Sequence, residues 1–304
     1  MLIRVGFEIG IRVDQPTPMA MNLCVHPSRQ GDIWRETGLT TVPTTPVEIY
    51  EDSHGNHSAR CLLPEGGLDI RYDAFVEDSG RPDPIEIHAR QVPVEKLPAE
   101  TLVYLLASRY CETEHLSAIA WKLFGETKPG WERVQAICDY VHDRLSFSYG
   151  YARNTRTACQ AHDERVGVCR DFAHLAVALC RCMNIPARYV NGYLGDIGVP
   201  ADPAPMDFNA WFEAYIGDRW YTFDARHNQR RVGRIVVARG RDATDIPLVH
   251  TFGPHRLETF NVWTYEVKDR VREGRDIKAK HSLIEPWHSP FWATHSSQNR
   301  PRAS

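Results

Sequence analysis

The stretch Gly167-Val168-Cys169-Arg170-Asp171-Phe172-Ala173-His174-Leu175 opens the segment that decides the fold of this chain. From Gly167 to Asn184, apolar residues recur at the spacing of one helix face, and Pro186 ends the pattern. Few side chains on this face are large, so another structural element can pack closely against it. The face consists of Cys169, Ala173, Ala176, Cys180 and Met183. We therefore expect a tightly packed helix that begins beside Cys169.

A β-hairpin is the strongest structural signal after this helix. Residues 187–194 read as a single strand. The runs 210–216 and 219–224 are rich in aromatic residues and alternate with period two. Gly217-Asp218 joins them, and such a pair is typical of two-residue hairpin turns. We expect these strands to lie in one antiparallel sheet against the Cys169 helix.

The register of this hairpin predicts which side chains share a sheet face. A two-residue turn pairs Ile216 with Arg219, and side chains alternate between the two faces from there. Asn209 and Asp224 then become diagonal neighbours, with Cα atoms about 7–8 Å apart. The shared face carries Asn209, Trp211, Asp224 and Arg226. A side chain at position 209 could therefore reach both Asp224 and a residue delivered by the Cys169 helix.

The rest of the chain predicts an α+β fold class. Residues 1–95 alternate with period two and favour a small, mostly antiparallel β-sandwich-like domain. Prolines near residues 80–100 mark a linker, and helical patterning begins near residue 100 and is clear at Trp131–Leu145. We expect a second domain over residues 96–287. Residues 288–304, rich in Ser, His, Asn and Arg, are expected to be a disordered tail.

Composition points to an ordinary globular protein. Forty-two per cent of the residues are hydrophobic and 25% are charged, which suits a buried core. The net charge of -3 gives no reason to expect nucleic acid or an anionic membrane as a partner. The charged, alternating N-terminus lacks the apolar run of a signal peptide, and no stretch is long enough to span a bilayer. We expect a soluble, cytoplasmic protein of undetermined oligomeric state.

No metal or other cofactor is expected from the sequence. The eight cysteines form no Cys-x-x-Cys pair, so a structural zinc site is not indicated and the thiols are expected to be mostly free. Asp196, Asp202 and Asp207 are spaced too loosely for a calcium loop.

Cys169 is the candidate nucleophile. At a helix N-terminus, unpaired backbone N–H groups and the helix dipole favour a thiolate. The N–H of Cys169 itself could stabilise an oxyanion, and Gly167 would let a substrate backbone come close. The alternative is a small structural cysteine, as expected for Cys180 on the same helix.

These segments resemble the bacterial transglutaminase-like superfamily, whose core is papain-like. The resemblance rests on Gly167 to Leu175, Asn184 to Leu194, Asn209-Ala210-Trp211-Phe212-Glu213 and Trp220-Tyr221-Thr222-Phe223-Asp224. It covers about residues 130–228, and the β-rich start resembles the N-terminal domain that often accompanies this core. The resemblance implies that Cys169 is the nucleophile of amide chemistry and that Asp224 orients the base.

Position 209 departs from the pattern of this superfamily, which has the histidine base there. Asn209 can form hydrogen bonds but has no useful proton affinity near neutral pH. The difference could be natural with another base or reaction, natural in a silent binding module, or engineered. If a base is simply missing, Asn209→His should create one. The expected site nevertheless comprises Cys169, Asn209 and Asp224 in one cleft, with Asn209 in the middle.

Other residues near the motifs could take part in the site. His227 would need a bend after Asp224 to reach the site face, and His174 points away from Cys169 on the same helix. Arg170 and Asp171 are expected to cap the helix or form ion pairs. Tyr149 and Tyr151 could shape a substrate groove or serve packing.

The sequence thus predicts cysteine-dependent amide or acyl chemistry on a peptide or other amide-containing substrate. Hydrolysis and transamidation share one thioester, so both remain open. The first alternative is a catalytically silent binding module that keeps the groove. The second is a non-peptide acyl transferase or cyclase that uses a different base.

Overall fold

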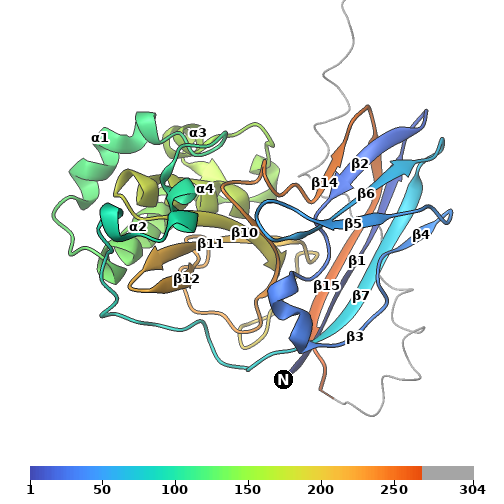
Figure 1. Ribbon diagram of the computed structural model, residues 1–304, viewed down its shortest axis with the longest axis horizontal. Coiled ribbons are helices and arrows are strands. Elements are labelled where there is room, and N and C mark those ends of the chain that lie inside the picture. The colour runs from blue at the N-terminus through green and yellow to red at the C-terminus, as the bar shows by residue number, and fades with distance from the viewer. Residues whose placement is uncertain (269–304) are drawn as a thin grey trace, which may run out of the picture.

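The computed structural model describes residues 1–268 of the chain. Figure 1 shows a β-sandwich on the right and, on the left, a group of helices with their own sheet. We call the second region, between residues 94 and 240, the α+β part. The expected α+β fold class is confirmed, with antiparallel β-sheets near the N-terminus and a helical core packed on a sheet.

The β-sandwich consists of two antiparallel sheets. One has the strand order β15-β1-β7-β3, with β4 also paired to β7, and the other has the order β14-β2-β6-β5. The strands of the first sheet are β1 (Leu2–Arg12), β3 (Ile33–Glu36), β4 (Thr40–Val42), β7 (Leu68–Glu77) and β15 (Arg256–Glu266). Those of the second are β2 (Thr17–Met21), β5 (Glu48–Glu51), β6 (His57–Leu63) and β14 (Val249–Thr251). A 3-10 helix, η1 (Pro27–Asp32), connects β2 to β3.

Alternating side chains of β1 form the centre of the sandwich. Ile3, Val5, Phe7, Ile9 and Ile11 are fully buried in a core that also includes residues of both sheets. The same core continues into the α+β part, where it takes in Tyr193, Phe208 and Ala210 among others. One hydrophobic core therefore spans both architectures, and the α+β part has a second core of its own around α4.

Strands β14 and β15 return from the end of the described chain to the sandwich. β15 pairs with β1, and β14 pairs with β2. Sequence patterns placed these residues in the second domain, so the sheets of the first part are completed by residues from the second. The division into residues 1–95 and 96–287 stays a prediction, and its boundary at 287 and the tail 288–304 lie outside the described residues.

The α+β part builds a four-stranded antiparallel sheet with the order β12-β11-β10-β13. Its strands are β10 (Ala187–Tyr193), β11 (Asn209–Ile216), β12 (Arg219–Phe223) and β13 (Ile235–Gly240). Ile216 pairs with Arg219, which confirms the predicted hairpin register. The fourth strand, β13, pairs with β10 and was not predicted.

Helix α4 is the central helix of this part. Every residue of α4 (Cys169–Cys182) after Cys169 is buried, because helices and sheet surround it on all sides. The other helices are α1 (Thr113–Phe124), α2 (Trp131–Arg144) and α3 (Ala158–Glu164). Short elements complete the part, namely β8 (Ser146–Phe147), β9 (Val166–Gly167) and the 3-10 helices η2 (Val94–Lys96), η3 (Ala99–Leu105) and η4 (Tyr149–Tyr151). The helical patterning expected to begin near residue 100 thus corresponds to the 3-10 helix η3.

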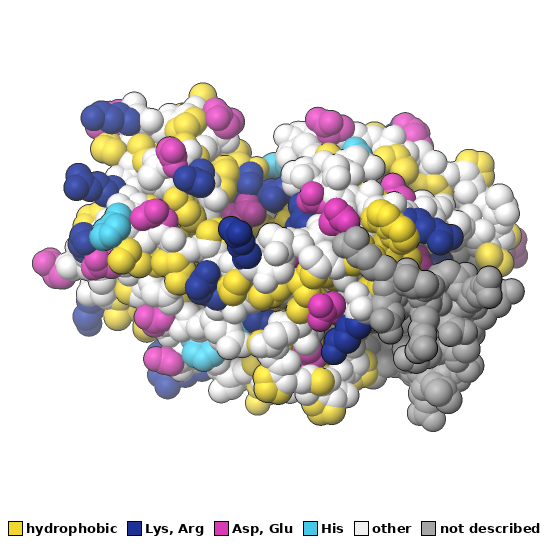
Figure 2. Space-filling model, turned by 90° about the horizontal axis from the view of Figure 1, so that it is seen from below, with side chains coloured by type: hydrophobic (Ala, Val, Ile, Leu, Met, Phe, Trp, Pro, Cys, Tyr) yellow, Lys and Arg dark blue, Asp and Glu magenta, His cyan; other side chains and the backbone are white. Residues whose placement is uncertain are grey.

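The chain between β7 and η2 connects the two regions along the lower edge of the molecule in Figure 1. On the face shown in Figure 2, acidic and basic side chains are intermixed over the α+β part. No helix within residues 1–268 is long and apolar enough to cross a membrane.

Gly6 tests how tightly the first sheet is packed. A Cβ atom at this position would lie 2.4 Å from the carbonyl oxygen of Tyr72 and 2.4 Å from the ring of Trp263. We expect Gly6→Ala to reduce the free energy of unfolding by about 1–3 kcal/mol, because the backbone must shift. Urea unfolding followed by circular dichroism measures this loss.

Gly31→Ala is the matched control, because a Cβ there meets nothing within 4 Å. Its expected change is below about 0.5 kcal/mol. Equal stability of the two variants would contradict the packing described for β1.

Candidate active site

Cys169 is the first residue of α4, and Asp171 holds the start of this helix. The Oδ2 atom of Asp171 accepts a hydrogen bond from the N–H of Val168 at 2.9 Å. A Cβ atom on Gly167 would lie only 2.6 Å from the Cβ of Asp171. Glycine at 167 is therefore needed for the approach of Asp171, in addition to any role in admitting a substrate.

Two buried arginines tie Asp171 to the preceding loop. Arg156 donates to Asp171 Oδ2 at 3.0 Å and to the carbonyl of Tyr151 at 2.6 Å. Arg170 donates to the carbonyls of Arg153 and Asn154. The loop before α3 and the start of α4 therefore form one connected polar network.

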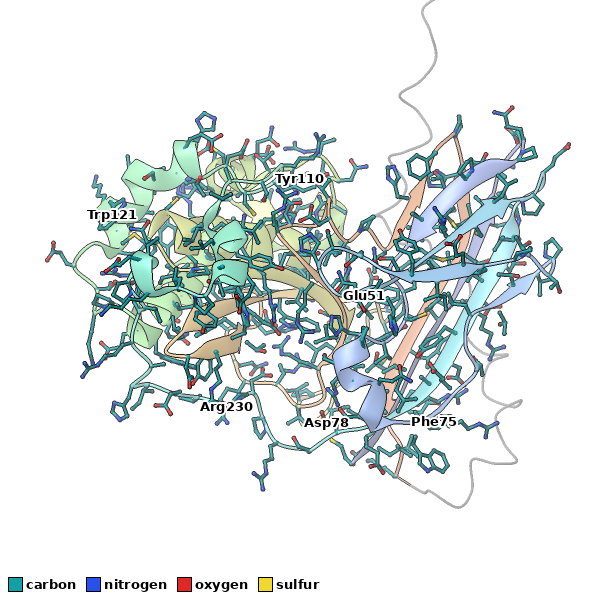
Figure 3. The ribbon with its side chains drawn as sticks, viewed as in Figure 1. Glu51, Phe75, Asp78, Tyr110, Trp121 and Arg230 are labelled. Carbon is teal, nitrogen blue, oxygen red and sulfur yellow. The ribbon has the colours of Figure 1, made fainter. Side chains whose placement is uncertain are left out.

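The side chain of Cys169 opens into a cavity of about 690 Å³ between the sandwich and the α+β part. Figure 3 places Tyr110, one of the lining residues, in the upper region of the α+β part. Asn209 and Asp207 also line this cavity, together with Tyr149, Tyr189 and Asn191. Residues of the sandwich contribute to the wall, among them Asn22, Tyr50 and Ser58.

The surroundings of Cys169 hold the thiol in its protonated form. Burial raises the pKa of Cys169 to about 11, since a thiolate would lose its hydration there. The guanidinium of Arg226 and a hydrogen bond from the backbone of Ala210 act in the opposite direction, whereas Asp207 and Asp171 add to the increase. The helix N-terminus alone thus does not produce the thiolate expected from the sequence.

Asn209 begins β11 and contacts Arg226. Its Oδ1 accepts a hydrogen bond from Arg226 Nη1 at 3.0 Å, and its Nδ2 lies 3.5 Å from the carbonyl of Leu194. The guanidinium of Arg226 also stacks on the ring of Phe147, 3.7 Å from the ring centroid. Asn209 therefore helps to hold a cation within electrostatic range of Cys169.

Asp224 lies just beyond the end of β12 and does not line the cavity. Its Oδ2 accepts a hydrogen bond from Arg234 at 2.8 Å, and its Oδ1 accepts from the backbone N–H of Arg226 and of His227. Burial alone would raise the pKa of Asp224, but Arg234 and His227 hold it well below its usual range. Asp224 is therefore a permanent carboxylate at neutral pH.

His227 is the imidazole that Asp224 orients. The Nδ1 atom of His227 lies 2.8 Å from Asp224 Oδ2. An ionised carboxylate can only accept, so Nδ1 carries the proton and Nε2 of the neutral ring has the free lone pair. The chain bends sharply here, because the carbonyl of Asp224 accepts from the N–H of Asn228 at 2.8 Å. The expected bend after Asp224 is thus present, although His227 is not among the residues that line the cavity.

Arg234 links the acid to the connection between the two regions. It donates to Asp224 through Nη2 and to Asp83 Oδ2 through Nε at 2.9 Å, and it is buried. The N–H of Arg231 also donates to Asp83 at 3.0 Å. The linker thus supports the residue that keeps Asp224 ionised.

His174, the other histidine considered from the sequence, has a structural role. It is fully buried, and its Nε2 accepts from the N–H of Ala243 at 3.1 Å. Its ring stacks on Tyr110 with centroids 5.0 Å apart. Burial lowers the pKa of His174 to about 3, so it stays neutral inside the core.

The structure brings some of the expected site residues together. Cys169 and Asn209 line one cavity, whereas the carboxylate of Asp224 bonds His227 and Arg234 and makes no direct hydrogen bond to Asn209. Sequence reasoning missed Asp207 and Arg234, and it placed Arg226 opposite Asn209 without giving it a role. Within residues 1–268, no group of three His, Cys, Asp or Glu side chains is placed to hold a metal ion.

Comparison with known proteins agrees with the fold described above. Residues 117–225 match the core model of the transglutaminase-like superfamily. An uncharacterized protein of Mycobacterium tuberculosis is 36% identical over 228 residues, which cover 68% of this chain and 73% of the relative. An uncharacterized protein of Mycobacterium leprae is 31% identical over 116 residues, and this match spans 37% of this chain and 41% of the relative.

A solved structure from Cytophaga hutchinsonii is similar over nearly the whole chain. It is described as a candidate cysteine protease, with 29% sequence identity and a TM-score of 0.77. The match covers 96% of this chain and 95% of the other. The similarity therefore includes the β-sandwich as well as the α+β part.

The charge of Asp207 should control the reactivity of Cys169. Because this carboxylate raises the thiol pKa, Asp207→Asn should lower the pKa and increase the thiolate fraction at pH 8. We expect iodoacetamide to alkylate Cys169 about three- to tenfold faster in the variant, since one pKa unit is a tenfold change in thiolate. Mass spectrometry of the Cys169 peptide over time, from pH 7 to 11, gives the rate.

Asp218→Asn, in the exposed turn of the hairpin, is the control and should leave the rate unchanged. A slower or equal rate in the Asp207 variant would show that its charge does not act on the thiol.

Proposed function

Because this chain belongs to the transglutaminase-like superfamily and has a cysteine protease fold, we propose that it is a cysteine-dependent enzyme of amide or acyl chemistry. One observation carries this proposal. Cys169 stands at the start of a buried helix, opens into a cavity large enough for a peptide segment, and receives a backbone N–H from Ala210. A cysteine with only a packing role would not need such access.

In the proposed reaction, the sulfur of Cys169 attacks the carbonyl carbon of an amide. The new C–S bond forms while the C–N bond breaks, and the thiol proton goes to the departing amine by way of a base. Water as acceptor then releases a carboxylic acid, whereas an amine forms a new amide. The backbone N–H of Cys169 is available to stabilise the oxyanion of the tetrahedral intermediate.

His227 is the proposed base, in place of the histidine that is absent at position 209. Asp224 fixes its tautomer, which leaves Nε2 with the lone pair that a general base needs. His227 is not among the residues that line the cavity, so in this proposal its proton transfer with Cys169 depends on a side-chain movement or an intervening water molecule. The neighbouring residue, Arg226, is already within electrostatic range of the sulfur. Asn209 then acts as a positioning residue, because it bonds Arg226 and lines the cavity.

Replacing the nucleophile and the proposed base tests the proposal. Cys169→Ala should abolish hydrolysis of p-nitrophenyl acetate above background. His227→Gln should lower kcat/KM by about 10²–10⁴-fold, the usual size of general-base assistance, and should flatten its pH profile. His115→Gln on the exposed side of α1 is the matched control and should keep full activity.

If Cys169→Ala retains full activity, Cys169 is not the nucleophile. If the protein itself never exceeds background with esters or peptides, the silent binding module becomes the better description.

The variant Asn209→His tests whether His227 has taken over as the base or whether the site has no base. The oxygens of Asp224 already accept from His227, Arg234 and two backbone N–H groups, so an imidazole at 209 finds no free carboxylate to orient it. The substitution also removes the acceptor of Arg226. We therefore expect this variant to be no faster than the protein itself in the same assay, and a rise of tenfold or more would show that position 209 lacks its base.

A further inference from the structure

The outer face of the sheet β14-β2-β6-β5 forms a groove that leads away from Cys169. Ala20 and Pro18 of β2 form its floor, because both point away from the sandwich core while Met19 and Met21 point into it. Leu62 is 56% exposed and Phe252 is 65% exposed, although both are large and apolar. They flank Pro18, because Leu62 pairs with Pro18 and the N–H of Phe252 donates to the Pro18 carbonyl.

This groove is continuous with the active-site cavity. Ala20, Tyr50 and Phe252 line both that cavity and a second hollow farther along the sheet. The strand registers arrange the outer side chains in successive rows. The first row holds Asn22, Ser58 and Tyr50, the second His250, Ala20, Arg60 and Glu48, and the third Phe252, Pro18 and Leu62. Successive rows are about 7 Å apart, since each spans two residues of a strand.

The dimensions and chemistry of the groove suit an extended polypeptide. Crossing from the first row to the third takes about four residues of extended chain. The floor combines apolar side chains with the exposed ion pair between Arg60 and Glu48. A peptide has polar backbone groups for the ion pair and apolar side chains for the rest, whereas a hydrocarbon chain has no polar groups. The strand β5 ends its sheet, so within residues 1–268 no strand pairs with its outer edge. Figure 3 places Glu51, the last residue of β5, where the two regions meet.

We propose that the groove along β2 binds an extended segment of the substrate polypeptide, at least four residues away from the amide that Cys169 attacks, with an apolar side chain between Leu62 and Phe252. The inference rests on the proposed function and narrows its substrate class from any amide to a polypeptide chain. The β-sandwich is then part of the substrate site.

Chloroacetyl peptides test this proposal through covalent labelling of Cys169. One series carries the chloroacetyl group on its N-terminus and the other on the side chain of a C-terminal lysine, so that the peptide extends in either direction. In each series, an eight-residue peptide of alternating Leu and Thr is compared with chloroacetamide itself at pH 9. We expect one series to label Cys169 about tenfold faster than chloroacetamide does. Burial of one apolar side chain in the groove should strengthen binding of the peptide by about that factor.

Substitutions test whether the faster labelling by peptides depends on Leu62 and Phe252. The ratio of peptide to chloroacetamide labelling should fall toward one in Leu62→Ser and Phe252→Ser. Val42→Ser removes an equally exposed apolar side chain from β4, outside the groove, and should keep the original ratio.

A ratio near one for both peptide series would overturn the proposal, as would an advantage that survives both groove substitutions. If chloroacetyl-decylamine gains the same groove-dependent advantage while the peptides do not, the occupant is an acyl chain and the assignment to a polypeptide is wrong. Failure of Cys169 to react with chloroacetamide and with both peptide series would overturn the proposed nucleophile and, with it, this assignment, whereas reaction with chloroacetamide without any peptide advantage would overturn the groove alone.

Discussion

The hydrogen bond from the N–H of Val168 to the buried carboxylate of Asp171 is the constraint on which the site depends. It fixes the N-terminus of α4, and the helix cannot shift because all its later residues are buried. Gly167 must be glycine to admit Asp171, and Arg156 extends the same network to the loop that lines the cavity. The position of Cys169 is therefore set by packing beneath it, which leaves the groups around the cavity to determine its reactivity.

Those groups divide the site into two electrostatic halves. Around Cys169, burial and Asp207 keep the proton on sulfur despite Arg226. Around Asp224, Arg234 and His227 keep the carboxylate ionised despite its burial. Asp224 therefore stays ionised at neutral pH, and its carboxylate accepts hydrogen bonds from the imidazole of His227 and from Arg234. Because its pKa is raised, Cys169 is mainly a thiol at neutral pH, and thiols react more slowly with alkylating agents than thiolates do.

Much of the fold could be predicted because its signals are local. The stripe of small residues identified α4, and the Gly217-Asp218 turn determined the β11–β12 register, from which the proximity of Asn209 and Arg226 follows. The return of β14 and β15 to the sandwich could not be predicted, because these pairings join residues more than 180 positions apart. The hydrogen bond between Asp224 and His227 could not be predicted either. It forms in a turn that side-chain and backbone hydrogen bonds stabilise, and the alternation of side chains along a strand does not describe such a turn.

The shared core explains why the sandwich and the site form one unit. Phe208, between the cavity residues Asp207 and Asn209, packs against Phe7 of β1 and Tyr193 of β10. The hydroxyl of Tyr193 donates to the carbonyl of Leu23 in the sandwich. Removing the sandwich would expose Phe208 and release the segment that carries Asp207 and Asn209, and it would take away one wall of the cavity. The β-sandwich therefore shapes the site through the core as well as through its surface.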